Sequence, residues 1–172
     1  MKKLILLTVV FLSACGGPSA PEGDEESGVQ TAETAVIYEA QGGLHTWILN
    51  VKTAKFYEGD ETAFLTEPQL QFRDGTKNMS SITADAGTAS MKDNSIVLQG
   101  NVYGKSAARN AELKTTVLNY DIKNKKIWTD ETVYVRRNGV TVRAKGLRAN
   151  GDFSEIEFKG QTTTIPENEK DF

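Results

Sequence analysis

The stretch ITADAGTASMKDNSIVLQGNV, residues 82–102, decides the fold that the rest of the chain follows. Ile82, Ala84 and Ala86 alternate with polar or small residues, an alternation typical of a half-buried β-strand. Lys-Asp-Asn at positions 92–94 favours a turn, because Asp and Asn bond their own backbone and tolerate left-handed dihedral angles. Apolar residues alternate again from the turn to the end of the stretch. The stretch therefore predicts two β-strands joined by a tight turn.

The same unit recurs along the chain at nearly constant spacing. When Lys52, Ala84, Thr115 and Ala144 are taken as origins, successive origins are 32, 31 and 29 residues apart. An apolar residue stands twelve positions after each origin, namely Phe64, Ile96, Ile127 and Ile156. A turn follows each origin, namely Glu58-Gly59-Asp60, Lys92-Asp93-Asn94, Lys123-Asn124-Lys125 and Asn150-Gly151-Asp152. Alternation by chance is the competing interpretation, but four turns at matched offsets favour a repeat of stacked β units.

From Val36 onward almost every segment has the period of a β-strand. Asn138-Gly139 is the strongest local signal, because Asn-Gly favours a type I′ turn, which here joins Val133–Arg137 to Val140–Gly146. A short piece around Glu33–Ala40 is the one place where a helical period is plausible. Many short strands with regular turns predict an all-β domain built from repeated antiparallel hairpins, as a sandwich, barrel or jelly roll.

The composition limits the chemistry that the chain can perform. One cysteine and one histidine in 172 residues exclude a disulfide framework and a His-rich metal site. His45 stands beside Trp47 without a catalytic motif, so we expect a surface or packing histidine. Two carboxylate pairs, Asp130 with Glu131 and Glu155 with Glu157, could be proposed for acid–base catalysis. We expect them at exposed strand ends, and adjacent carboxylates point to opposite faces of a strand, which disfavours this role. We therefore expect a protein that is not an enzyme and that holds no metal and no cofactor. An enzyme that acts on envelope polymers is kept as the last-ranked of three functional hypotheses, and the other two are given below.

The N-terminus has the features of an export signal. Met1-Lys2-Lys3 is positively charged, and Leu4 to Ala14 form an eleven-residue apolar run, shorter than the roughly 20 residues that a membrane-spanning helix needs. Leu12-Ser13-Ala14-Cys15 resembles the lipobox of bacterial lipoproteins, in which small residues guide cleavage before a cysteine that becomes lipidated. The resemblance implies a mature chain that begins at Cys15 with several acyl chains, enough for stable membrane anchoring.

Composition sets the boundaries of the folded domain. Residues 16–35 contain Gly, Pro, Ser and five acids but no base, so they bury too little apolar surface to fold. We expect a signal peptide at 1–14, the lipidated Cys15 with a flexible acidic tether at 15–35, a β domain at 36–165 and a tail at 166–172.

Basic residues gather in the second half of the chain. Residues 101–150 contain eleven Lys or Arg and four Asp or Glu. Lys114, Arg143 and Lys145 are out of phase with the apolar positions, so we expect them on the outer surface, either simply solvated or in contact with an acidic partner. No nucleic-acid partner is expected, because the export signal removes the chain from the cytoplasm and no aromatic ladder accompanies the basic residues.

Two motif pairs resemble a known family. Ser81–Asp85, SITAD, followed by Ile96–Val102, IVLQGNV, is similar to the repeat of the OstA-like proteins of lipopolysaccharide export. Thr141–Leu147, TVRAKGL, followed by Ile156–Gly160, IEFKG, is similar to their second characteristic unit. The match spans roughly Thr46 to Thr163, and for a single membrane-anchored domain of this length it resembles the LptC family, which is related to LptA. LptC proteins carry one membrane-spanning helix where this chain has a lipobox.

The resemblance implies a fold, partners and a location. The fold is a twisted β-jelly roll with an open groove between two sheets and a free edge at each end. One edge meets the periplasmic domains of the inner-membrane ABC transporter, and the other adds a strand to an LptA-like bridge protein. The lipid A part of lipopolysaccharide passes along the groove. The protein is expected at the periplasmic face of the inner membrane, held by its lipid anchor, with the outer membrane as an alternative.

The residues that would line such a groove follow from the phase of each strand. They are Leu49, Val51, Phe64, Phe72, Ile82, Leu98, Val102, Val117, Ile127, Val133, Val142, Ile156 and Phe158. The same positions form an ordinary core if the sheets enclose no groove, and a one-residue slip would reverse any strand's faces. A structural or adaptor lipoprotein that binds proteins by its sheet edges is the second hypothesis for function.

Overall fold

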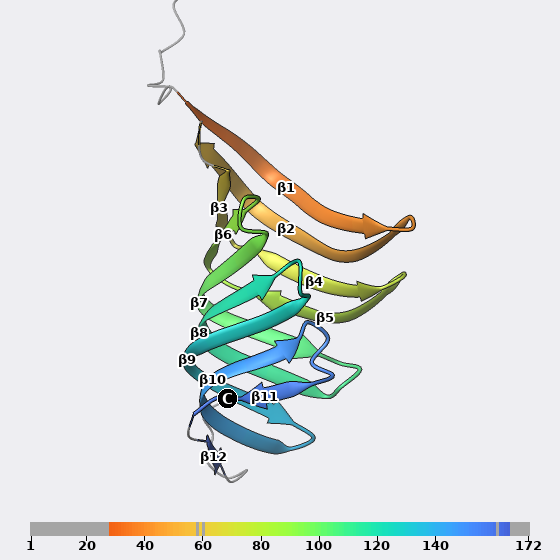
Figure 1. The fold of residues 1–172 in the computed structure, drawn as a ribbon, viewed down its shortest axis with the longest axis vertical. Coiled ribbons are helices and arrows are strands. Elements are labelled where there is room, and N and C mark those ends of the chain that lie inside the picture. The colour runs from red at the N-terminus through yellow and green to blue at the C-terminus, as the bar shows by residue number, and fades with distance from the viewer. Residues whose placement is uncertain (1–27, 58, 60, 161, 166–172) are drawn as a thin grey trace, which may run out of the picture.

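The computed structural model describes residues 28–57, 59, 61–160 and 162–165. Twelve β-strands and no helix occur among these residues, and all the strands join one antiparallel sheet (Figure 1). The strands are β1 (Val29–Gln41), β2 (Leu44–Tyr57), β3 (Thr62–Thr66), β4 (Gln69–Asp74), β5 (Lys77–Thr83), β6 (Ala86–Ser90), β7 (Ser95–Ser106), β8 (Ala111–Asp121), β9 (Lys126–Arg137), β10 (Val140–Asn150), β11 (Ile156–Phe158) and β12 (Thr162–Ile165). The predicted all-β fold of repeated antiparallel hairpins is confirmed.

The sheet is folded into two half-sheets that face each other. Half-sheet 1 contains β4, β5 and β12, and half-sheet 2 contains β3, β6 and β11. The six longer strands contribute one half to each: the first half of β2 pairs with β4, and its second half pairs with β3. Strand β1 lies at one end of this stack, and β11 and β12 lie at the other (Figure 1). The chain is therefore a twisted β-jelly roll.

A register shift in β7 marks the crease, which is the line along which the sheet folds into its two half-sheets. The pairing of β7 with β8 changes register between Gln99 and Val102. Gly100 and Asn101 there have φ angles of 75° and 42°, in the left-handed region that Gly and Asn tolerate best. The Asn101 side-chain amide donates to the Asp85 carboxylate at 2.7 Å, and the Asp85 backbone N–H donates to Gly100 at 3.0 Å. Asp85 and Asn101 thus hold the bend where a regular strand would run straight.

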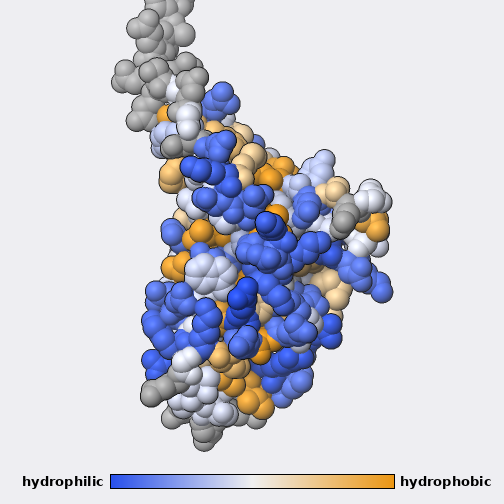
Figure 2. Space-filling view, viewed as in Figure 1, coloured by the Kyte–Doolittle hydropathy of each residue, from blue (hydrophilic) through white to orange (hydrophobic). Residues whose placement is uncertain are grey.

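The inner faces of the two half-sheets form one apolar core. Fully buried side chains of half-sheet 1, such as Leu49 and Ile82, belong to the same cluster as Leu98 and Ile127 of half-sheet 2. Burial of each such side chain contributes about 1.5–3 kcal/mol. Hydrophilic residues cover most of the outer surface in the view of Figure 2. The period-2 pattern of the sequence is therefore the pattern of a sheet with one buried face.

The type I′ turn at Asn138-Gly139 is confirmed, since the two residues have φ angles of 50° and 81°.

The suggested helical piece at Glu33–Ala40 is wrong, because these residues belong to β1 and pair along most of β2. Strand β1 begins at Val29, seven residues before the expected start of the β domain. Residues 29–35 are therefore strand where we expected tether, and pairing with β2 outweighs their weak local preference.

The expected signal peptide, the lipidated Cys15 and the tail at 166–172 lie outside the described residues. So do Glu58 and Asp60 of the first predicted turn. Within the described part of the chain, no helix is long and apolar enough to span a membrane.

Candidate functional site

An apolar cavity of about 560 Å³ opens between the half-sheets at the β1 end of the molecule. Its apolar lining comes from both half-sheets and consists of Ile37, Trp47, Phe56, Ala63, Ala89, Met91, Ile96 and Ile122. Its polar lining consists of Glu39, Glu61, Ser90, Asn94 and Ser95. A concave site of this volume with mostly apolar walls and a few polar groups is typical of a site for a hydrophobic ligand.

One row of residues across half-sheet 2 explains why the space is hollow. Phe56, Ala63, Ala89 and Ile96 are paired in that order across β2, β3, β6 and β7, so their side chains stand side by side on the inner face. The two alanines in the middle of the row bring almost no volume, whereas Phe56 and Ile96 at its ends are large. The row is therefore a trough with raised ends.

The opposite wall is held in place by a carboxylate of β1. The indole Nε1 of Trp47 donates to Glu39 Oε2 at 2.9 Å, and Thr46 Oγ1 donates to the same oxygen at 3.1 Å. These bonds fix the Trp47 ring against the cavity while its polar edge is satisfied, as a buried indole requires. The carboxylate is thereby engaged with protein donors, so the cavity presents mainly hydrocarbon and aromatic surface to a ligand.

Aromatic side chains pack behind Trp47, which lines the cavity. Tyr120 of half-sheet 2 packs edge-on against Trp47 and Phe72 of half-sheet 1, with ring centroids 6.2 Å and 4.8 Å apart. Burial raises the pKa of the Tyr120 phenol well above its usual range, and the negative charges of Glu39 and Asp121 raise it further. Tyr120 is therefore neutral at physiological pH, and its ring supports Trp47 from the interior.

The carboxylates that sequence reasoning considered for acid–base work lie on the surface in ion pairs. Asp130 pairs with Lys159 at 3.3 Å, Glu131 with Lys145 at 3.5 Å, and Glu155 with Lys126 at 3.4 Å. No group of three or more metal-binding side chains occurs among the residues that the structure describes.

Eight of the thirteen predicted groove residues are buried in the core between the half-sheets. They are Leu49, Val51, Phe72, Ile82, Leu98, Val102, Ile127 and Val133. Three more, Val142, Ile156 and Phe158, are half-buried near the β11 and β12 end. Ile156 and Phe158 pack against the core. These positions are therefore interior ones, but none of them lines the cavity at the β1 end.

Two predicted groove residues are not on the buried inner face. Phe64 is 46% exposed, because its neighbours Ala63 and Leu65 are the inward residues of β3. Val117 pairs with the exposed Gln99 and is only half-buried, and Leu118 fills the core in its place. In β8 the crease shifts the alternation by one residue, which reverses the faces on its far side.

The sequence contained part of the signal for the cavity. Trp47 and Ile96 lie in the inward phase of their strands, and the small partner Ala89 opposite Ile96 marks the hollow. Which residues become partners depends on the strand order β2–β3–β6–β7, which joins segments far apart in the chain. Ala63 and Ala89 could not be recognised as neighbours without it. Arg143 and Lys145 are exposed as predicted, and Lys114 is half-buried.

The fold and the cavity define a class of protein: a β-jelly roll whose folded sheet encloses an apolar site that is open at one end. A family model described as "Lipopolysaccharide-assembly, LptC-related" matches residues 4–167. The chain therefore belongs to the LptC family, and this membership supports a role in lipopolysaccharide transport.

A solved structure is similar over much of the chain. It is described as LptH, the LptA homologous periplasmic component of the conserved lipopolysaccharide transport device from Pseudomonas aeruginosa. The two sequences are 9% identical, the match covers 83% of this chain and 96% of that chain, and the TM-score is 0.44. No curated protein matches this chain.

Proposed function

We propose that this protein is the membrane-anchored periplasmic component of lipopolysaccharide export, and that the apolar cavity at the β1 end receives lipid A acyl chains. It accepts lipopolysaccharide from the inner-membrane ABC transporter and passes it to an LptA-like bridge protein. The family membership supports the pathway. The observation that carries the proposal is the cavity of about 560 Å³ with its trough of Phe56, Ala63, Ala89 and Ile96.

The chemistry of the cavity suits a hydrocarbon chain. Its lining supplies two large aromatic side chains, Trp47 and Phe56, and several aliphatic ones, whereas its polar groups include the carboxylate that already holds Trp47. Apolar burial contributes about 25 cal/mol per Å², so an acyl chain gains free energy by entering. The polar headgroup of the same lipid would stay in water at the open end.

The two ends of the sheet support the proposed partners. Strand β1 pairs only with β2 among the described strands, and β11 and β12 pair only with β10. Unpaired strand edges are templates for the addition of a strand from another protein. We assign one edge to the transporter's periplasmic domains and the other to the LptA-like bridge. An adaptor that binds proteins only through these edges is the alternative.

The anchor is a separate part of the proposal with its own test. Lipidation of Cys15 would hold the domain at the periplasmic face of the inner membrane. A Cys15→Ser variant should then leave the membrane fraction after cell fractionation, while the wild-type chain stays in it. A variant that remains in the membrane fraction would remove the lipid anchor from the proposal and leave the cavity untouched.

In vivo photocrosslinking tests the lipid-binding role. Phe56 lines the cavity, whereas Phe64 on the neighbouring strand points to the outer surface. A photoreactive phenylalanine analogue at either position is therefore a matched pair in the same part of half-sheet 2. We expect lipopolysaccharide to be trapped at position 56 and not at position 64.

Other patterns would count against the proposal. Equal labelling at both positions would show adventitious contact with membrane lipid. No labelling at either position, in variants with β-sheet circular dichroism like that of the wild type, would favour the adaptor. Leu98, an attractive position from the sequence, is 1% exposed, so a charged residue there would disrupt the core before it tested lipid passage.

A further inference from the structure

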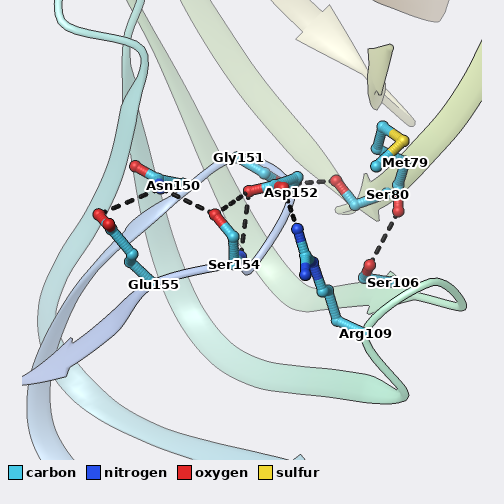
Figure 3. Close-up of polar contacts among 9 residues, drawn as sticks. All are labelled: Met79, Ser80, Ser106, Arg109, Asn150, Gly151, Asp152, Ser154 and Glu155. Carbon is cyan, nitrogen blue, oxygen red and sulfur yellow. Dashed lines mark hydrogen bonds and ion pairs between the residues drawn. The ribbon is translucent and has the colours of Figure 1, made fainter. Parts of the chain in front are cut away.

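The loop between β10 and β11 crosses the open side of the folded sheet and joins the two half-sheets. We call this loop, residues 151–155, the strap. It leaves half-sheet 2 at Asn150 and reaches Ser80 of β5 and Arg109, which follows β7, on the side of half-sheet 1 (Figure 3). Phe153 in the middle of the strap is 1% exposed. A surface loop thus carries one of the most deeply buried aromatic residues of the molecule.

Two glycines make room for the strap. Phe153 lies over Gly104 of β7, where an added Cβ would come within 2.8 Å of the ring carbon Cζ. Gly151 lies so close to the Phe72 ring that a Cβ there would collide with it. Phe153 also has a φ angle of 60°, which side chains of this size rarely adopt. Seating of Phe153 between the half-sheets therefore depends on this particular backbone conformation.

The strap is attached firmly at its base on half-sheet 2. The Asn150 amide donates to Ser154 Oγ at 2.8 Å and to Glu155 Oε2 at 3.2 Å, and the backbone N–H of Phe153 donates to Asn150 at 3.0 Å. Lys126 of β9 donates to Asn150 and pairs with Glu155 at 3.4 Å. This network would keep the ends of the strap on half-sheet 2 during any movement of its tip.

The attachment to half-sheet 1 is much smaller. Ser80 Oγ donates to the Gly151 carbonyl oxygen, and Arg109 pairs with Asp152 at 3.4 Å. The Arg109 and Asp152 side chains are 41% and 26% exposed, and ion pairs with that exposure stabilise weakly. Apart from these polar contacts, the apolar seat of Phe153 holds the tip. The strap is therefore built to release from half-sheet 1 and to remain on half-sheet 2.

Release of the strap would open space in the interior, because Phe153 is buried between the half-sheets. The cavity opens at the β1 end, and a hydrocarbon chain moving toward β11 has to pass between the half-sheets at the level of β4 to β8. Phe72, Tyr120 and Phe153 are the aromatic side chains at that level, and they fill the interior together with aliphatic side chains such as Ile82 and Leu118. Phe72 and Tyr120 belong to paired strands, so their backbone cannot move aside without breaking the sheet. Phe153 belongs to a loop and can leave without breaking a strand pairing.

We infer that the strap is a gate, with Phe153 as its plug, between the cavity at the β1 end and the interior at the β11 end. When the strap is seated, an acyl chain reaches the cavity but goes no further. When the tip lifts from Ser80 and Arg109, the space that Phe153 leaves admits the chain. This inference rests on the proposed function and adds the residues that control onward passage.

The test uses two reporters and a reversible lock in the full chain. A photoreactive phenylalanine at position 56 reports entry into the cavity, and one at position 158, on β11 beyond the strap, reports passage. Arg109→Cys and Asp152→Cys together are joined by a short, reducible bifunctional thiol reagent. Each single cysteine variant is treated with the same reagent. These two controls show the effect of attaching the reagent to one cysteine and of any reaction at Cys15. Ser80→Ala loosens the strap without a new reactive group.

We expect locking to abolish most lipopolysaccharide labelling at 158 and to spare labelling at 56, which also shows that the locked chain is folded. Reduction of the reagent should restore labelling at 158, and Ser80→Ala should increase it. Labelling at position 158 that is the same with and without the lock would overturn the gate. So would a complete lack of labelling at 158 in a chain that is labelled at 56. Both results would leave the proposed function standing. Absence of labelling at 56 in the unlocked chain would overturn both.

Discussion

The Phe72 and Tyr120 rings meet edge-on across the interior, with centroids 4.8 Å apart and planes at 85°. Phe72 belongs to β4 of half-sheet 1 and Tyr120 to the second half of β8 in half-sheet 2. The contact therefore joins the two half-sheets directly, where the backbone connects them only at the crease. Tyr120 also packs against Trp47, which lines the apolar cavity, so the contact lies directly behind one wall of that cavity.

The coupling between these two rings should be measurable. Phe72→Leu and Tyr120→Leu should each lower the free energy of unfolding by roughly 1–3 kcal/mol, because each removes buried aromatic surface. The double variant should lose about 0.5–1.5 kcal/mol less than the sum, since an edge-on aromatic pair contributes that much beyond burial. Urea unfolding of the four proteins gives the coupling energy.

Tyr57 and Phe64 provide a matched control for that cycle. Their rings are also edge-on, with centroids 5.3 Å apart and planes at 84°, but the residues are 38% and 46% exposed. The same leucine replacements there should give a smaller coupling energy. A coupling as large on the outer surface as in the interior would contradict the view that the Phe72–Tyr120 pair joins the half-sheets.

The pH dependence of stability should report the burial of Tyr120. Burial raises the pKa of its phenol in the folded state above the value of about 10 in the unfolded chain. Above pH 10 the unfolded chain then binds fewer protons than the folded one, so stability falls as pH rises, by at most about 1.4 kcal/mol per unit. The contribution of the neutral, buried Tyr120 phenol to stability is fully present below pH 10. Urea unfolding between pH 8 and 11.5 should show a steeper decline for the wild type than for Tyr120→Phe, and equal slopes would contradict the assignment.

The seat of Phe153 predicts a compensating pair of substitutions. Gly104→Ala should lower the free energy of unfolding by about 1–3 kcal/mol, because the new methyl group meets the Phe153 ring. Phe153→Leu in the same chain should recover part of that loss, since the shorter side chain leaves room for the methyl group. Thermal or urea unfolding of the two single variants and the double variant tests this. Strict additivity would mean that Phe153 does not rest on Gly104 in solution.

Much of the fold was accessible from the sequence because its signals are local. The alternation around Ile82 and Leu98 identifies strands, and Asn138-Gly139 identifies a hairpin whose turn geometry the structure shows. Each of these signals depends on residues within a few positions of one another. The repeat unit of the sequence, strand–turn–strand, corresponds to long strands that cross the crease and are joined by tight turns.

The errors in the sequence prediction concern the inward phase of two strands. The phase carried through β8 placed Val117 inside, but the crease shifts the phase of this strand by one residue. In β3 the inward residues are Ala63 and Leu65, so Phe64 between them faces outward. Which strand breaks, and where, depends on distant partners such as Asp85, which bonds to Asn101. The cavity and the seat of Phe153 on Gly104 likewise join residues that no sequence window contains.

The crease itself offers a last prediction, at Asn101. Its φ angle of 42° is left-handed, which Gly adopts freely, Asn tolerates and a β-branched residue resists. Asn101→Gly should lower the free energy of unfolding by about 0.5–1.5 kcal/mol, the contribution of the lost hydrogen bond to Asp85. Asn101→Val loses the same bond and also forces the strained backbone, so it should cost roughly 1–3 kcal/mol more than Asn101→Gly. Thr116→Val, at an exposed position of β8, should change stability by less than about 0.5 kcal/mol. If urea unfolding gave the same stability for Asn101→Val and Asn101→Gly, the sheet would not be bent by a left-handed residue at this position, and the two half-sheets would need another hinge.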